Sequence, residues 1–189
     1  MRRILPAMIG GLFLVACGGQ DAPPPDDAAP PADVAPAPAP AATATAMVAN
    51  AEGTSLGTLT LTETADGIHV TGTLEGLPAG DHGFHIHTTG QCAPPDFQSA
   101  GGHWNPTGKE HGSENPNGPH FGDMTNITVA DDGTVSIDLT TPGGTLTGDS
   151  ALLDSDGAAV MVHATADDYR TDPAGDAGAR IACGVILAS

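Results

Sequence analysis

Residues 53–77 read GTSLGTLTLTETADGIHVTGTLEGL, and this stretch decides the fold class. Thr, Val and Leu alternate along both halves, which is the side-chain period of a half-buried β-strand. The halves are separated by Ala65-Asp66-Gly67, and an Asp-Gly pair between two alternating runs is typical of a hairpin turn. The stretch therefore predicts two antiparallel strands joined by a tight turn.

Short runs of the same kind continue to the C-terminus. They are GFHIHTTG, the two halves of NITVADDGTVSIDLTT around Asp131-Asp132-Gly133, GAAVMVHA and RIACGVILA. Many short strands with Gly-rich turns predict an all-β fold, a Greek-key barrel or sandwich of immunoglobulin-like type with about eight antiparallel strands. Two long loops, roughly 88–125 and 164–179, interrupt the strands, and loops of this length are usually functional, stapled or disordered.

The N-terminal residues predict export. Arg2 and Arg3 precede the apolar run ILPAMIGGLFLVA, which is too short to span a bilayer and is typical of a signal peptide. LVAC resembles the lipobox of bacterial lipoproteins, so we expect residues 1–16 to be removed and Cys17 to be lipidated. The alternative is an ordinary secretory signal followed by a chance cysteine. The lipoprotein interpretation predicts a periplasmic protein anchored to a membrane, and Gly18 favours the outer membrane over the inner one.

Composition divides the rest of the chain into a tether and a domain. Residues 17–46 are rich in Pro and Ala with almost nothing to bury, which predicts a disordered tether behind the lipidated cysteine. Residues 47–189 are long enough for one hydrophobic core. The chain carries 23 Asp and Glu against 5 Lys and Arg. That balance argues against nucleic acid as a partner, because nucleic-acid binding needs clustered Lys and Arg.

Metal-binding side chains gather in this domain. They are His85, His87, His103, His111, His120, Asp123 and His163. Each histidine alone could be an exposed or a structural residue, so the interpretation depends on the set. Three imidazoles and one carboxylate in a loop suit a closed zinc site, and four imidazole nitrogens with an open position suit copper. The set is one side chain short of two four-coordinate sites, and a bridging imidazole would complete both.

The domain resembles the copper–zinc superoxide dismutases along nearly its whole length. The residues that carry this resemblance are GFHIH, AGGHWNP, the ladder of His103, His111, His120 and Asp123, VHATADD and GDAGARIACGVI. Several motifs in the same order make the resemblance specific. It implies one copper and one zinc ion per subunit. The implied copper ligands are His85, His87, His103 and His163, and the implied zinc ligands are His103, His111, His120 and Asp123.

Further residues match the family outside the ligand sets. Asp167 matches a carboxylate that hydrogen-bonds one ligand histidine of each metal, and Arg180 matches the arginine that guides and binds the anion beside copper. Cys92 and Cys183 match the family's disulfide, which is also expected of the two cysteines left after Cys17 in an exported protein. His82 matches a structural histidine. His69 matches no ligand and is expected to be a surface or structural residue.

The implied activity is the disproportionation of superoxide by copper cycling, with the His103 imidazole leaving copper, taking a proton and returning it. The alternative is a copper- and zinc-binding envelope lipoprotein without turnover. A homodimer is compatible with the resemblance. The chain departs from familiar members in a longer segment between Cys92 and His103 and in its scarcity of lysine. Only Arg170 and Lys109 could supplement Arg180, so we expect weak long-range steering of superoxide.

Overall fold

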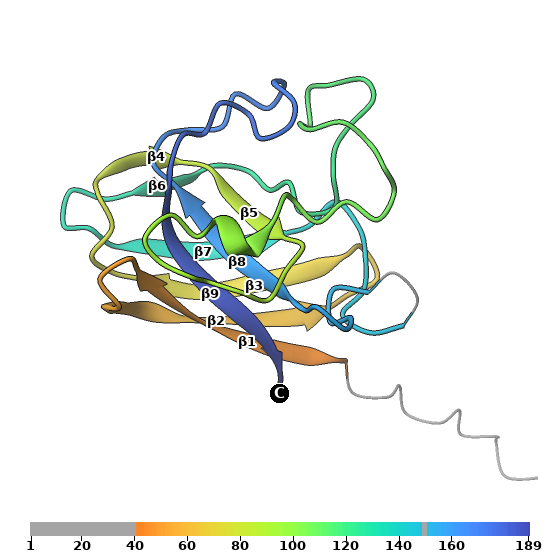
Figure 1. Ribbon diagram of the computed structural model, residues 1–189, viewed down its shortest axis with the longest axis horizontal. Helices are drawn as coiled ribbons and strands as arrows, with labels where there is room; N and C mark the ends of the chain where they lie inside the picture. The colour runs from red at the N-terminus through yellow and green to blue at the C-terminus, as the bar shows by residue number, and fades with distance from the viewer. Residues whose placement is uncertain (1–40, 149–150) are drawn as a thin grey trace, which may run out of the picture. The chain divides into compact units, whose positions relative to one another are not determined.

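The computed structural model describes residues 41–148 and 151–189, and this part of the chain is almost entirely β-strand and loop (Figure 1). The signal peptide, Cys17 and most of the predicted tether lie outside the described residues. The strands are β1 Thr43–Asn50, β2 Ser55–Glu63, β3 Ile68–Leu74, β4 Gly80–His82, β5 Phe84–His87, β6 Ile127–Val129, β7 Val135–Thr140, β8 Ala158–His163 and β9 Arg180–Ala188. The one helical turn in the described part is the 3₁₀ helix η1, Gln98–Ala100. None of the helical structure described could cross a membrane.

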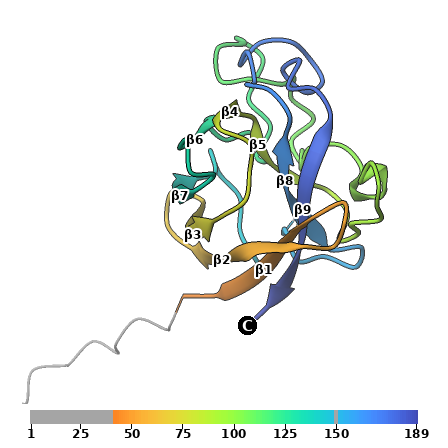
Figure 2. The same ribbon diagram turned by 90° about the vertical axis from the view of Figure 1, so that its left-hand side faces the viewer.

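Seven strands form an antiparallel sheet in the order β5-β8-β9-β1-β2-β3-β7, and β4 and β6 form a second small sheet. Figure 2 shows the large sheet curling around an interior, with β4 and β6 between its two edges. Strands far apart in the sequence are neighbours at β5-β8 and at β9-β1, as expected for a Greek-key arrangement. The predicted all-β fold is therefore confirmed.

The interior is filled by side chains that alternate along the strands. Leu59 and Leu61 of β2 and Ile68 and Val70 of β3 are fully buried, while Thr60 between the leucines is exposed and His69 between the β3 residues is partly exposed. The hairpin predicted from residues 53–77 is present, with Leu61 paired to Val70 and the main-chain N–H of Thr64 donating to Gly67 O at 2.8 Å. One apolar face per strand is enough to place this hairpin on the core.

The folded part begins upstream of the expected boundary at Met47. β1 starts at Thr43, and Ala44 and Ala46 are completely buried between β2 and β9. The sequence pattern assigned these residues to the tether because alanine and threonine offer little surface to bury. Their small side chains fit here because β1 is a central strand with a hydrogen-bonded neighbour on each side.

The two strands around Asp131-Asp132-Gly133 both form, and the turn closes with the N–H of Ala130 donating to Thr134 O at 2.9 Å. However, β6 pairs with β4 and β7 pairs with β3, so the turn connects the two sheets. The short β4 had not been predicted, since Gly-Asp-His has no apolar alternation.

Both predicted long loops are present, as residues 88–126 and 164–179. They lie side by side at one end of the barrel (Figure 1), joined by contacts such as the main-chain N–H of Glu114 donating to Tyr169 O at 3.1 Å. Most of the predicted metal-binding residues stand in or beside these loops.

Candidate metal centre

The edge strand β5 places the first group of histidines. His85 and His87 belong to β5, and His163 ends the neighbouring strand β8. His103 comes from the first long loop and forms an isolated antiparallel bridge with His87. One nitrogen from each of these four rings lies within 4.8 Å of the others, and all four residues are buried. We call His85, His87, His103 and His163 the four-histidine cluster.

Main-chain pairing with β5 also holds the loop. The N–H of Trp104 donates to Ile86 O at 2.8 Å, and the N–H of Ile86 donates to Gly122 O at 2.9 Å. Gly122 is needed for this close approach, because a Cβ there would lie 2.2 Å from Ile86 O. These bonds fix His103 and Asp123 against the strand, so a loop without apolar periodicity still has one defined path.

The nitrogens that face one another in the four-histidine cluster have no hydrogen-bond partner in the protein. They are His85 Nδ1, His87 Nε2, His103 Nε2 and His163 Nε2. A buried nitrogen left without a partner is unfavourable, and four that converge on one point are the donor set that copper prefers. The residues present therefore fit a copper ion.

The second nitrogen of each ring is occupied, which orients the ring. His85 Nε2 lies 2.7 Å from Asp167 Oδ2, and His87 Nδ1 lies 2.9 Å from Gly101 O. His103 Nδ1 lies 2.7 Å from Asp123 Oδ1. Burial lowers the pKa of His103 to about 4 and that of His163 to about 3. The rings are therefore neutral at neutral pH, the form in which imidazole binds a metal.

Asp123 organises the second group, the carboxylate cluster of His103, His111, His120 and Asp123. Its Oδ1 lies 2.7 Å from His103 Nδ1 and 3.1 Å from Nδ1 of both His111 and His120. Its Oδ2 accepts main-chain N–H bonds from Gly112 and His120, both at 2.9 Å. Three imidazole nitrogens around one carboxylate oxygen fit a tetrahedral zinc ion.

Charge distinguishes the carboxylate cluster from the four-histidine cluster. Burial alone would raise the pKa of Asp123, but hydrogen bonds from His103, His111 and His120 outweigh it and hold that pKa far below its usual range. Burial alone would lower the pKa of His111, but Asp123 and Asp167 outweigh it and raise it to about 9. In the metal-free protein His111 is therefore a cation paired with two carboxylates.

Asp167 connects the two clusters, in the position the resemblance implied. Its Oδ2 meets His85 Nε2 at 2.7 Å and its Oδ1 meets His111 Nε2 at 3.0 Å. Asn126 holds the main chain of Asp167 from both sides: its Nδ2 donates to Asp167 O at 2.9 Å, and its Oδ1 accepts from Asp167 N at 2.8 Å. The sequence analysis missed Asn126, because an Asn after a loop carries no signal for a contact 41 residues away.

A pocket of about 360 Å³ opens over His103, and its wall includes Lys109, His120, Asp172 and Arg180. Arg180 is half-buried and points two N–H groups at main-chain carbonyls, Phe97 O at 2.8 Å and Gly101 O at 2.7 Å. Lys109, one of the two cations expected to supplement Arg180, therefore lines the same pocket. Arg170 does not line this pocket, because its guanidinium pairs with Glu114 on the surface.

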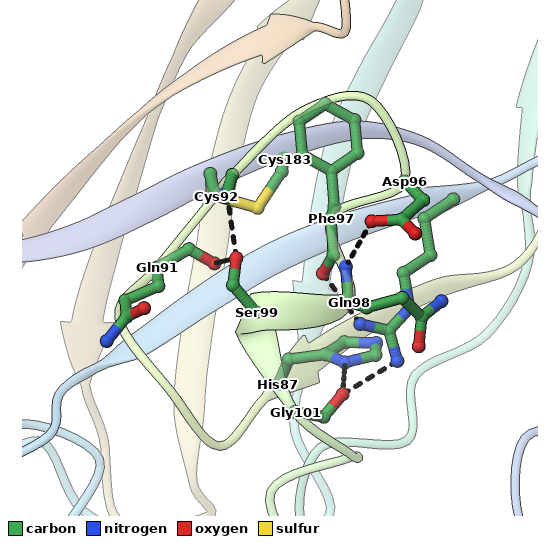
Figure 3. Close-up of a disulfide and its surroundings, with 11 residues drawn as sticks. His87, Gln91, Cys92, Asp96, Phe97, Gln98, Ser99, Gly101 and Cys183 are labelled. Atoms are coloured by element: carbon green, nitrogen blue, oxygen red, sulfur yellow. Dashed lines mark hydrogen bonds between the residues drawn. A yellow bond between two sulfur atoms is a disulfide. The ribbon is translucent and has the colours of Figure 1, made fainter.

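The predicted disulfide is confirmed. Cys92 and Cys183 are bonded with their Cα atoms 5.7 Å apart, tying the first long loop to β9 (Figure 3). The bond lies next to a small buried cluster that includes Phe97, Ala159 and Met161.

The two remaining histidines lie outside both clusters. His82 is buried, and its ring nitrogens face His163 O at 2.8 Å and Pro78 O at 2.9 Å. His69 lies on β3 with its Nε2 2.7 Å from Asp138 Oδ1 at the surface. These positions agree with the structural and surface roles expected for them.

Comparison with known proteins points to one family. The family model described as copper/zinc superoxide dismutase matches residues 55–186. The chain is 48% identical over 140 residues to a copper–zinc superoxide dismutase of Aquifex aeolicus, covering 72% of this chain and 82% of that protein. It is 38% identical over 190 residues to the superoxide dismutase-like protein YojM of Bacillus subtilis, covering 98% of this chain and 96% of that protein.

A solved structure with the same fold also matches this chain. The crystal structure of a SOD-like protein from Bacillus subtilis, in a double mutant where a tyrosine and a proline are replaced by histidine, matches with a TM-score of 0.72. It shares 44% sequence identity, and the match covers 76% of this chain and 96% of that one.

Proposed function

The chain belongs to the copper/zinc superoxide dismutase family, and we propose that it is a catalytically active member. Its reaction would convert two superoxide anions and two protons into dioxygen and hydrogen peroxide. The observation that carries the proposal is the complete four-histidine cluster, with four unpaired nitrogens, beside a pocket lined by Arg180. We further propose that each subunit binds one copper ion at this cluster and one zinc ion at the carboxylate cluster.

Arg180 would bind the anionic substrate. Copper held by the four imidazoles would supply one-electron redox chemistry, and zinc would hold the loop and set the basicity of the shared imidazole. Burial lowers the pKa of Arg180 from 12.5, yet a guanidinium stays charged at neutral pH. Its two carbonyl partners use part of its five N–H groups, so others remain for superoxide.

His103 would handle a proton. With zinc held at the carboxylate cluster, the His103 ring would carry its exchangeable proton on Nε2, the atom that faces the other three histidines, only while that atom is not a copper ligand. His103 lines the pocket that Arg180 also lines, so water in that pocket lies close to the ring, while Nε2 itself is buried. The ring would therefore be placed to give a proton to the reduced product and to regain one from water in the pocket.

The second candidate function is copper and zinc binding without turnover. It is favoured by the relative that matches 98% of this chain, which is called superoxide dismutase-like. A solved double mutant of a protein so described carries histidines in place of a tyrosine and a proline. In this chain all four positions of the four-histidine cluster are already histidine, which favours the enzyme.

A direct assay separates the two functions. The full chain is loaded with copper and zinc, and superoxide decay is followed beside His163→Ala and Arg180→Ala. We expect rapid decay with the parent, near-complete loss with His163→Ala, and a partial loss with Arg180→Ala at retained metal content. The full chain is used because truncation at Met47 would cut β1. Decay no faster than that of free copper would leave only the metal-binding function.

We also propose that the protein is exported and held at the cell envelope, at the outer rather than the inner membrane, by lipid on Cys17. The support is the charged, apolar and LVAC sequence of residues 1–17. Incorporation of labelled fatty acid into the chain, but not into Cys17→Ala, would test the anchor. Fractionation of the two membranes would test its location. A homodimer stays a prediction, and sedimentation of the metal-loaded chain would test it.

A further inference from the structure

The guanidinium of Arg180 is hydrogen-bonded to main-chain carbonyls at both ends of one short turn. Its Nη1 donates to Phe97 O at 2.8 Å and its Nη2 donates to Gly101 O at 2.7 Å, and these carbonyls flank η1. Gly101 O also accepts from His87 Nδ1 at 2.9 Å. The place of the guanidinium therefore depends on where the segment 97–101 lies against the barrel.

Apart from its apolar side chains, that segment is held by hydrogen bonds within the same loop: the N–H of Thr89 donates to Ala100 O at 3.0 Å, and Ser99 Oγ accepts from Ala93 N at 2.8 Å and donates to Gln91 O at 3.2 Å. Residues 91–96 are mostly exposed, and the disulfide ties the chain at Cys92, well before the carbonyls that hold Arg180. Within the segment, Phe97 and Ala100 are buried. Phe97 is the one large side chain of the two. It lies in a buried cluster with Met161 of β8 and Cys183 of β9, separate from the main core. Figure 3 shows the Phe97 ring near Cys183.

Phe97 also has a backbone conformation that side chains seldom adopt. Its φ is 53° and its ψ is 22°, in the left-handed region. A bulky residue is uncommon there and persists when its surroundings hold it in place. The buried ring and the N–H of Phe97, which donates to Ala93 O at 3.1 Å, supply that restraint. The same residue thus carries the anchoring ring and one of the two carbonyls.

We propose that Phe97 is a positioning residue for Arg180: its ring, packed on β8 and β9, sets the carbonyl that holds one arm of the guanidinium. In this chain the disulfide tethers the loop, and the Phe97 ring fixes the position of the Phe97 carbonyl. The catalytic consequence rests on the proposed superoxide dismutase function. The placement of Arg180 by Phe97 does not depend on that function and can be measured separately.

The test compares Phe97→Gly, Phe97→Leu and Gln98→Ala in the metal-loaded full chain. Glycine removes the ring and accepts the left-handed backbone, and leucine removes only part of the apolar surface. Gln98 is the exposed neighbour in the same turn and is the matched control. The first readout is the rate at which phenylglyoxal modifies Arg180, mapped by mass spectrometry. Arg170, whose side chain is 67% exposed, is the internal reference.

We expect the rate at Arg180 relative to Arg170 to rise about tenfold in Phe97→Gly, as for the loss of one hydrogen bond to a charged donor. Phe97→Leu should show a smaller rise, and Gln98→Ala none. Azide, a small anionic probe, should bind Phe97→Gly more weakly by a similar factor, while metal content and the disulfide are retained. A loop that is merely less stable would lower the melting temperature without changing azide affinity.

An unchanged Arg180 rate in Phe97→Gly would overturn the proposal, as would an equal rise in Gln98→Ala. If Phe97→Gly does not fold, Phe97→Leu decides the question in the same assay. If neither the parent nor any variant removes superoxide, the proposed function is wrong. The rates at which phenylglyoxal modifies Arg180 would still show whether Phe97 positions the guanidinium.

Discussion

The four-histidine cluster and the carboxylate cluster share His103 but are built in different ways. Two members of the first, His85 and His87, lie on β5, and His163 ends β8, so the barrel places most of it. In the second cluster all members come from the first long loop, and Asp123 Oδ1 gathers their nitrogens. Strands thus position one candidate site, and a carboxylate positions the other.

The two clusters also differ in charge. In the four-histidine cluster, burial lowers the pKa of His163 to about 3, and the ring stays neutral. In the carboxylate cluster, two carboxylates raise the pKa of His111 to about 9 against the effect of burial. The four-histidine cluster therefore offers a metal neutral imidazoles without prior loss of a proton. A charged site in a loop gains more order from the ion it binds.

The largest expected effect is that of His103→Ala, because His103 belongs to both clusters. We expect loss of superoxide decay and a fall in affinity for both copper and zinc that exceeds the 10–100-fold typical of losing a supporting partner. Competition with a chelator, followed by metal analysis, measures both affinities. His69→Ala, a surface histidine, is the control. Parental zinc affinity in His103→Ala would show that the clusters are independent.

Asp167→Asn should have the next largest effect, since its carboxylate touches His85 of one cluster and His111 of the other. We expect affinity for each metal to fall by about 10–100-fold, as for other partners that orient ligand histidines. Asp138→Asn, a surface carboxylate beside His69, serves as the matched control. A loss confined to one metal would mean that Asp167 supports only that cluster.

Proton release should distinguish the clusters near neutral pH. Zinc binding to the metal-free protein should release about one proton, because His111 is protonated below about pH 9. Copper binding should release almost none, because His103 and His163 are already neutral above about pH 4. Calorimetry in two buffers of different ionisation enthalpy gives both numbers. Equal proton release by the two metals would contradict the difference in charge.

The same pKa shifts set the pH dependence of metal-free stability. His111 has a folded pKa of about 9, above the ordinary histidine pKa of 6.5, so its contribution is complete below pH 6.5 and is lost as pH rises toward 9. His103 and His163 have lowered pKa values of about 4 and 3, so stability falls as pH drops from 6.5 toward these values. Urea unfolding of the metal-free chain should therefore show greatest stability near pH 6.5. A stability that rises steadily to pH 9 would exclude a protonated His111.

The smallest expected effect is that of salt on the reaction rate. Lys109 is the one lysine or arginine besides Arg180 in the wall of the pocket over His103, and the whole chain carries a net charge of −18. Long-range attraction of superoxide should be weak, so the rate should change less than about threefold between low and physiological ionic strength. Stopped-flow decay at several salt concentrations, with Lys109→Ala beside the parent, measures it. A steep fall with added salt would show strong steering.

Sequence patterns predicted much of this molecule. Alternation along residues 53–77 predicts the β2–β3 hairpin, because side-chain period is a local property. The residue types predicted the pool of metal-binding side chains, and the family resemblance assigned its members to the two clusters that the structure brings together. β1 and β4 were missed or cut short, because alanine-rich and three-residue strands have no such period.

By itself, the amino-acid sequence determined the strand-rich fold class, the histidine sets, Asp167, Arg180 and the cysteine pair. Only the tertiary structure decided that β6 and β7 part into different sheets, that Asn126 holds Asp167, and that Phe97 O and Gly101 O hold Arg180. The reason is physical. A ligand is specified by its side chain, whereas a pairing partner or a main-chain carbonyl is common to every residue and acquires its role from its position in the fold.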